Sequence, residues 1–114
     1  LGQAAQRTPL VALITNPEQH SGVLVSTMGV LDRERGGFAR LCLNLESAAH
    51  DVAFNCVVVR DDARFETLAS GIEGGAEGRY VQLIGTFDSS RPRPLRYAGV
   101  IKDLRVIRTL PYDP

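Results

Sequence analysis

The stretch VLVSTMGVL, residues 23–31, is a run of apolar and β-branched residues interrupted by one glycine, Gly29. β-Branched residues favour strands, and a glycine inside a strand commonly marks a bulge or a sharp bend. The stretch YVQLIGTF, residues 80–87, repeats this arrangement with Gly85. Because a small barrel must bend its strands to close around a core, these two stretches predict a barrel. The alternative is an open α+β sheet built from the same elements.

Three further strands and two helices are predicted around these stretches. Alternating leucines predict a second strand over residues 38–45, and β-branched residues predict a third over residues 52–59. The fifth strand is expected within residues 99–109. A short helix should begin at Thr8-Pro9, and a second helix over residues 61–70 should separate the third strand from the fourth. This order predicts a mostly-β fold, a five-stranded Greek-key barrel of the OB type.

The length and the charge of the chain limit its organisation and its partners. We expect residues 1–114 to form a single OB-like domain, with a loose arm at residues 1–7 and a tail at residues 111–114. The 13 basic and 13 acidic residues give a formal net charge of zero, which by itself predicts neither a nucleic-acid nor a membrane partner. No apolar run reaches the roughly 18 residues that a transmembrane segment requires.

Two motifs resemble a largely uncharacterised family of OB-fold domains in bacterial proteins, grouped near the anticodon-binding-like OB proteins. The first is NPEQHSG, residues 16–22, followed by a strand that holds Val25 and Gly29. The second is YVQLIGTFD, residues 80–88, followed by GVIKDL, residues 99–104. Members of this family are often exported or lipid-anchored, so the resemblance implies the barrel fold and a periplasmic or cell-envelope location. It implies no known activity.

Two cysteines, Cys42 and Cys56, could form a disulfide if the domain is exported. The alternating leucines of the second strand should face the core, which directs Cys42 outward. Cys56 shares its face with Phe54 and Val58, and we expect that face to be the core. A cross-strand disulfide requires both Cβ atoms on one face. A buried free Cys56 is therefore the favoured interpretation, and a bulge that shifts the register would reverse it.

No combination of residues predicts a catalytic or metal site. His20 and His50 lie in polar turns without acidic or cysteine partners at the spacing of metal ligands. No serine lies in a nucleophile elbow. The glycines between residues 71 and 78 precede a strand, whereas a dinucleotide-binding loop precedes a helix. We therefore expect no enzyme activity, no metal and no cofactor.

Arginines near the expected ligand face are the strongest functional signal. OB barrels bind ligands on their second and third strands, flanked by the loops after strands one and four. In this chain those loops are residues 32–37 and 88–94, and both contain arginines. The planar guanidinium group of arginine pairs well with phosphate and carboxylate. The candidate ligand-binding residues are Arg33, Arg35, Phe38, Arg40, Asn44, Arg91 and Arg93.

These residues predict a non-catalytic binding or assembly module for an anionic envelope ligand or a protein partner. An exposed strand edge could also join two copies into a homodimer. The alternative function is single-stranded nucleic-acid binding, which requires aromatic side chains on which bases stack. Only Phe38 lies near the expected face. An accessory domain of an enzyme is the third interpretation, and it requires polar residues that converge in a pocket.

Overall fold

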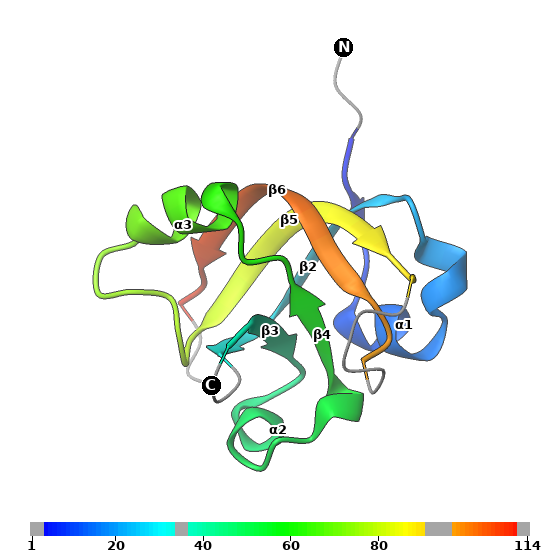
Figure 1. The fold of residues 1–114 in the computed structure, drawn as a ribbon, viewed down its shortest axis with the longest axis horizontal. Coiled ribbons are helices and arrows are strands. Elements are labelled where there is room, and N and C mark those ends of the chain that lie inside the picture. Colours follow the sequence, from blue (N-terminus) through cyan, green and yellow to red (C-terminus); the bar gives the residue numbers. More distant parts are fainter. Residues whose placement is uncertain (1–3, 34–36, 91–96, 112–114) are drawn as a thin grey trace.

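Five strands pair into a closed mixed barrel in the computed structural model, which describes residues 4–33, 37–90 and 97–111. A short sixth strand, β1 Gln6–Arg7, pairs with β2 outside the barrel. The strand order is β1-β2-β3-β4-β6-β5, and β5 also pairs with β2, which closes the barrel (Figure 1). β4 and β6 are parallel, whereas the other barrel pairs are antiparallel. This is the predicted OB-type arrangement. The barrel strands are β2 Leu24–Arg33, β3 Ala39–Cys42, β4 Cys56–Val59, β5 Tyr80–Asp88 and β6 Val100–Thr109.

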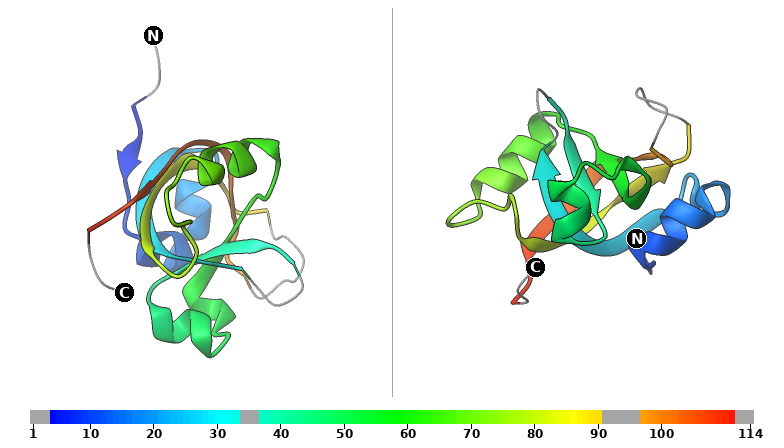
Figure 2. Two further views of the ribbon diagram at one scale, coloured as in Figure 1. Left: turned by 90° about the vertical axis from the view of Figure 1, so that its left-hand side faces the viewer. Right: turned by 90° about the horizontal axis from the view of Figure 1, so that it is seen from below.

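Both glycines that led to the barrel prediction lie where two backbones approach closely. A Cβ atom on Gly29 would lie 2.5 Å from the carbonyl oxygen of Cys42, and one on Gly85 would lie 2.8 Å from that of Lys102. β2 can therefore bend from its pairing with β5 to its pairing with β3, and the strands curve around a common centre (Figure 2). The register of β5 against β6 shifts beside Gly85.

The helices are short and lie around the outside and at the end of the barrel. Asp62 caps α3, where its side chain accepts a hydrogen bond of 3.1 Å from the backbone N–H of Phe65. The buried ring of Phe65 then enters the main core. The helical elements are α1 Leu10–Thr15, the 3₁₀ turn η1 Pro17–His20, α2 Leu45–Ala49, the 3₁₀ turn η2 Ala53–Asn55 and α3 Ala63–Ser70.

Buried side chains form two separate cores because β3 and β4 are covered on both faces. Side chains of a strand alternate between its faces, so Leu41 and Val57 point into the barrel. Cys42, Cys56 and Val58 point outward, yet they are buried in a second apolar cluster beneath α2 and η2. This second cluster decides what the outer face of β3 and β4 can contact.

Several element boundaries differ from the sequence-based expectation. Residues 46–51, which separate the second and third predicted strands, contain most of α2, and β4 begins at Cys56 where the third strand was expected from residue 52. The arm predicted at residues 1–7 is partly wrong, because Gln6–Arg7 forms β1 and pairs in parallel with β2. Of the tail, only Pro111 lies within the described residues. No helix in the described ranges has the length and apolarity that crossing a membrane requires.

Candidate functional site

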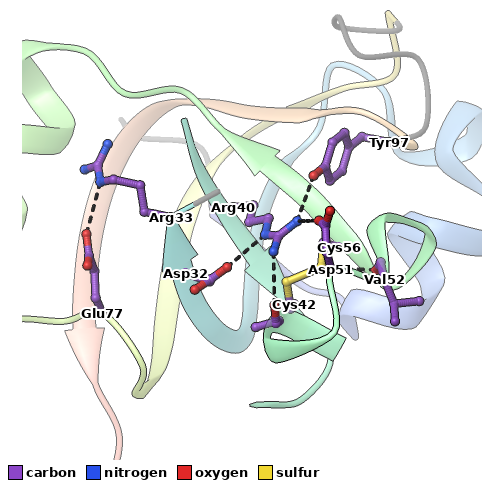
Figure 3. A network of polar contacts seen from close by, with 10 residues as sticks. Asp32, Arg33, Arg40, Cys42, Asp51, Val52, Cys56, Glu77 and Tyr97 are labelled. Carbon is purple, nitrogen blue, oxygen red and sulfur yellow. Dashed lines mark hydrogen bonds and ion pairs between the residues drawn. A yellow bond between two sulfur atoms is a disulfide. The ribbon is translucent and has the colours of Figure 1, made fainter. Parts of the chain in front are cut away.

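The outer face of β3 and β4, where OB barrels bind ligands, is covered by this chain itself. The segment between the two strands, residues 43–55, folds back as α2 and η2 and packs Ala48 and Ala53 against that face. Tyr97, which precedes β6, is also buried there, and its ring meets the half-buried Phe38 edge to face at 5.5 Å between centroids. We call residues 43–55 the cover segment. It is positioned by a disulfide and by a buried arginine (Figure 3).

Cys42 and Cys56 form a disulfide between β3 and β4, so the expectation of a buried free Cys56 is wrong. The two residues are directly opposite each other in the antiparallel pair, and both side chains point to the outer face. Cys42 points outward as predicted, whereas Cys56 lies on the other face of its strand from the one predicted. The face shared by Phe54 and Val58 is not the barrel core, because Phe54 is 72% exposed and Val57 faces the barrel interior.

Arg40 is the centre of a polar network that joins four parts of the chain. Its Nε donates to Asp32 Oδ2 at 2.9 Å. Its Nη1 donates to Asp51 Oδ1 at 2.6 Å and to the hydroxyl of Tyr97 at 2.9 Å, and its Nη2 donates to the carbonyl oxygen of Ala48 at 3.2 Å. Burial alone would lower the pKa of Arg40, but these hydrogen bonds outweigh it and raise the pKa above its usual value. The guanidinium group therefore holds the cover segment in place.

Asp51 reaches Arg40 because the chain turns sharply after α2. Its backbone has a φ of 53°, a left-handed conformation that aspartate tolerates better than most residues.

An open cavity of about 630 Å³ lies beside this turn, lined by Asp32, Arg33, Arg40, Asp51, His50 and two alanines. Its two arginines are both engaged with carboxylates of the same chain. This cavity therefore offers an incoming anion little net attraction.

Arg33 is likewise engaged with acidic side chains. It forms ion pairs with Asp61 and, at 3.0 Å, with Glu77, and Glu66 lies 3.9 Å away. The hydrogen bond from Arg33 holds the pKa of Asp61 below its ordinary value, and the hydrogen bonds to Asp61 and Glu77 raise the pKa of Arg33. Arg33 thus connects β2 to the segments around α3, as Figure 3 shows for its contact with Glu77.

Of the remaining candidates, only Asn44 lies within the described residues. Asn44 caps α2, where its side chain accepts a hydrogen bond of 2.7 Å from the backbone N–H of Ser47. Arg35, Arg91 and Arg93 lie outside the described residues. No group of three histidine, cysteine or acidic side chains in the described part of the chain could hold a metal ion.

A second groove lies on the outer face of β2, β5 and β6 and has a volume of about 530 Å³. Its described lining contains two arginines and no carboxylate. Gln82 donates a hydrogen bond of 2.7 Å to the hydroxyl of Ser26 and accepts a hydrogen bond from Arg108. The three side chains therefore form a ladder across the sheet. We call this the β2–β5–β6 groove, and its lining includes Arg7, Ser26, Met28, Gln82, Arg108 and Leu110.

Sequence reasoning missed this groove although part of its signal is present. Met28 and Gln82 are outward-facing positions of two strands, and they are register partners in the barrel. Strand alternation alone indicates which residues face outward. That these positions meet Arg108, 26 residues beyond Gln82, follows only from the pairing of β5 with β6.

The fold and this geometry define an OB-type barrel whose usual ligand face is covered and whose opposite strands carry an open, basic groove. No protein family and no curated protein matches the sequence. Among solved structures, a DUF3299 family protein from Pseudomonas aeruginosa PAO1 is similar with a TM-score of 0.62 and 11% identity, over 98% of this chain and 100% of that one. A putative aspartyl-tRNA synthetase from Leishmania major Friedlin is similar with a TM-score of 0.55 and 14% identity. This chain covers 23% of the synthetase chain, and 99% of this chain is aligned. Both likenesses concern the fold.

Proposed function

We propose that this domain is a non-catalytic binding module that receives an anionic group of a ligand or protein partner in the β2–β5–β6 groove. The observation that carries the proposal is the difference between two sets of arginines. Arg33 and Arg40 are neutralised by carboxylates of their own chain. Arg7 and Arg108 line a groove without a carboxylate among its described residues. A positive site without an internal counter-charge attracts anions.

The cover segment argues against the nucleic-acid alternative at the usual face of the barrel. Phe38, the aromatic side chain expected to stack a base, packs against Tyr97 instead. Arg40 donates to four partners within the chain. A nucleic acid at that face would have to displace the cover segment, which the disulfide ties to β3 and β4.

A periplasmic or cell-envelope location is part of the proposal. Disulfides form and persist in oxidising compartments and are rare in the reducing cytosol. The bridge between Cys42 and Cys56 is fully buried, as a structural disulfide is expected to be. It supports export together with the family resemblance.

Nuclear magnetic resonance titration of the ¹⁵N-labelled protein tests the proposed function. Citrate, inorganic phosphate and a short oligothymidylate would be added separately at about 50 mM salt, where contacts to anions are strong. We expect an anion to shift the amide signals of Ser26, Met28 and Gln82. The Arg7→Ala/Arg108→Ala variant should lose these shifts. Arg105→Ala is the matched control, because Arg105 is exposed on the same strand as Arg108 but does not line the groove.

Three results would overturn the proposal. If no anion shifts the groove amides, or if Arg105→Ala weakens binding as much as the double variant does, the groove is not an anion site. If the oligothymidylate instead shifts Phe38 and Tyr97, the nucleic-acid function at the usual OB face replaces the one proposed here.

A further inference from the structure

We infer that the natural occupant of the β2–β5–β6 groove is an extended acidic segment of a partner polypeptide, with two carboxylates four residues apart and an apolar residue midway between them. This inference rests on the proposed function and names the chemistry of its ligand. It follows from the lining of the groove, from the strand register and from the side-chain ladder on the sheet.

The lining of the groove favours a peptide over other anions. None of the described residues that line it is aromatic, so it lacks the stacking platform that single-stranded nucleic acids require. A single inorganic anion would leave most of the roughly 530 Å³ unfilled. Met28, 53% exposed on the wall of the groove, offers a flexible apolar surface that adapts to an aliphatic side chain.

Strand register gives the spacing of the two positive charges. Met28, Gln82 and Arg108 are successive partners across β2, β5 and β6, and Arg7 on β1 pairs with Ser26 on the other side of β2. Arg7 and Arg108 are thus separated by three strand-to-strand steps of about 4.8 Å each, or about 14 Å across the sheet. They are also offset by the two residues from Ser26 to Met28, about 7 Å along the strands, which gives about 16 Å in all. An extended chain covers about 13 Å in four residues. Carboxylates at positions i and i+4 therefore come within reach of the two arginines, whose long side chains span the remaining distance.

The same geometry places an apolar residue between the carboxylates. In an extended chain, residues i, i+2 and i+4 face the same side. When residues i and i+4 face Arg108 and Arg7, residue i+2 lies above the middle of the groove, within reach of Met28. The recognised pattern is acidic-x-apolar-x-acidic. This spacing distinguishes the occupant from an arbitrary polyanion.

Arg108 is held in place before a ligand arrives. Its Nη2 donates to Gln82, and Gln82 in turn donates to Ser26, which holds the guanidinium group over the sheet. An arginine has five N–H donors, and the described contacts of Arg108 account for one of them. A side chain that is already ordered loses less entropy on binding. The remaining donors can form a paired contact with a carboxylate.

Fluorescence anisotropy with labelled peptides tests the inference. The probe is a capped peptide with the core Asp-Ser-Leu-Ser-Asp. Its controls are Asn-Ser-Leu-Ser-Asn, which lacks the charges, and Asp-Asp-Leu-Ser-Ser, which has the same composition and the wrong spacing. We expect the probe to bind more tightly than both controls. Arg7→Ala and Arg108→Ala should each lower the affinity for the probe about threefold. The double variant should lower it about tenfold, as expected for two separate exposed ion pairs. Arg105→Ala should leave the probe's affinity unchanged.

The outcomes separate this inference from the proposed function. If the two acidic peptides bind equally, or if only citrate, phosphate or the oligothymidylate occupies the groove, the groove binds anions but not this peptide pattern, and the inference fails alone. If neither the peptides nor the small anions perturb the groove, both the inference and the proposed function fail. The thermal midpoint of each variant is measured first, so that weakened binding is not confused with unfolding.

Discussion

Removing the Cys42–Cys56 disulfide should destabilise the whole domain by about 3 kcal/mol. The two cysteines are separated by 14 positions in the sequence, and a closed loop of about this length restricts the unfolded chain by roughly 3 kcal/mol at 25 °C. Unfolding of a 114-residue chain carries an entropy of about 240 cal/mol/K, so the thermal midpoint should fall by about 12 °C. The loss should be seen in the Cys42→Ala/Cys56→Ala variant and in the reduced wild-type protein.

Urea unfolding followed by circular dichroism measures this effect, with and without a phosphine reductant. The reduced wild-type protein is the better comparison, because it keeps both sulfur atoms in the second core and leaves no cavity. The reductant should not change the free energy of unfolding of the double variant, which serves as the control for unspecific effects of the reductant. A difference below about 1 kcal/mol between the oxidised and reduced proteins would refute the reasoning, since restriction of the 43–55 loop would then not contribute as the chain-entropy argument requires.

Three further outcomes test the interior and the surface of the barrel. Arg40→Met should cost about 2 kcal/mol in urea unfolding, because it removes the buried donor to the hydroxyl of Tyr97 and to the carbonyl oxygen of Ala48. Thr27→Val should stabilise the protein by about 1 kcal/mol, because the buried hydroxyl of Thr27 has no hydrogen-bond partner among the described residues. Hydrogen bonds from Ser90 and Lys102 lower the pKa of Asp88 to about 2 from 3.8. Stability supplied by ionised Asp88 is therefore complete above about pH 4 and lost as the pH falls towards 2, so Asp88→Asn should be less stable than the wild type at neutral pH and approach it in acid.

The barrel could be predicted from the sequence because its decisive features are local. Gly29 and Gly85 interrupt apolar strands, and each is required by the close approach of a neighbouring backbone. The helix before β5 was predicted from its residue types, and Asp62 caps it in the structure. Strand propensity and the residue type at a bend depend mainly on the nearby sequence, so both can be recognised without knowledge of the fold.

The disulfide could not be predicted because strand alternation is informative only when one face of a strand is exposed. All four residues of β4, Cys56–Val59, are buried, since the barrel core covers one face and the cover segment covers the other. A continuous run of apolar residues then does not indicate whether the odd-numbered or the even-numbered residues of the strand face the barrel. Phe54 is exposed, although its apolar ring and its alternation with Cys56 predict a core position. The local sequence offers no correction, because α2 and η2 were not expected to fold back over β3 and β4.

The arginines illustrate why the candidate site was harder to predict than the fold. Arg33 and Arg40 are near the expected ligand face, but each has acidic partners in the folded chain. Glu77 is 44 residues from Arg33, and the two partners of Arg40 are 8 and 11 residues from it. Arg7 and Arg108 are not among the sequence-based candidates, yet the structure brings them to one groove without a described carboxylate. Whether an arginine can attract a ligand depends on which charges surround it after folding. The residues worth testing are therefore arginines that share a groove without a carboxylate among the described residues, and Arg7 and Arg108, on strands away from the covered face, meet this condition.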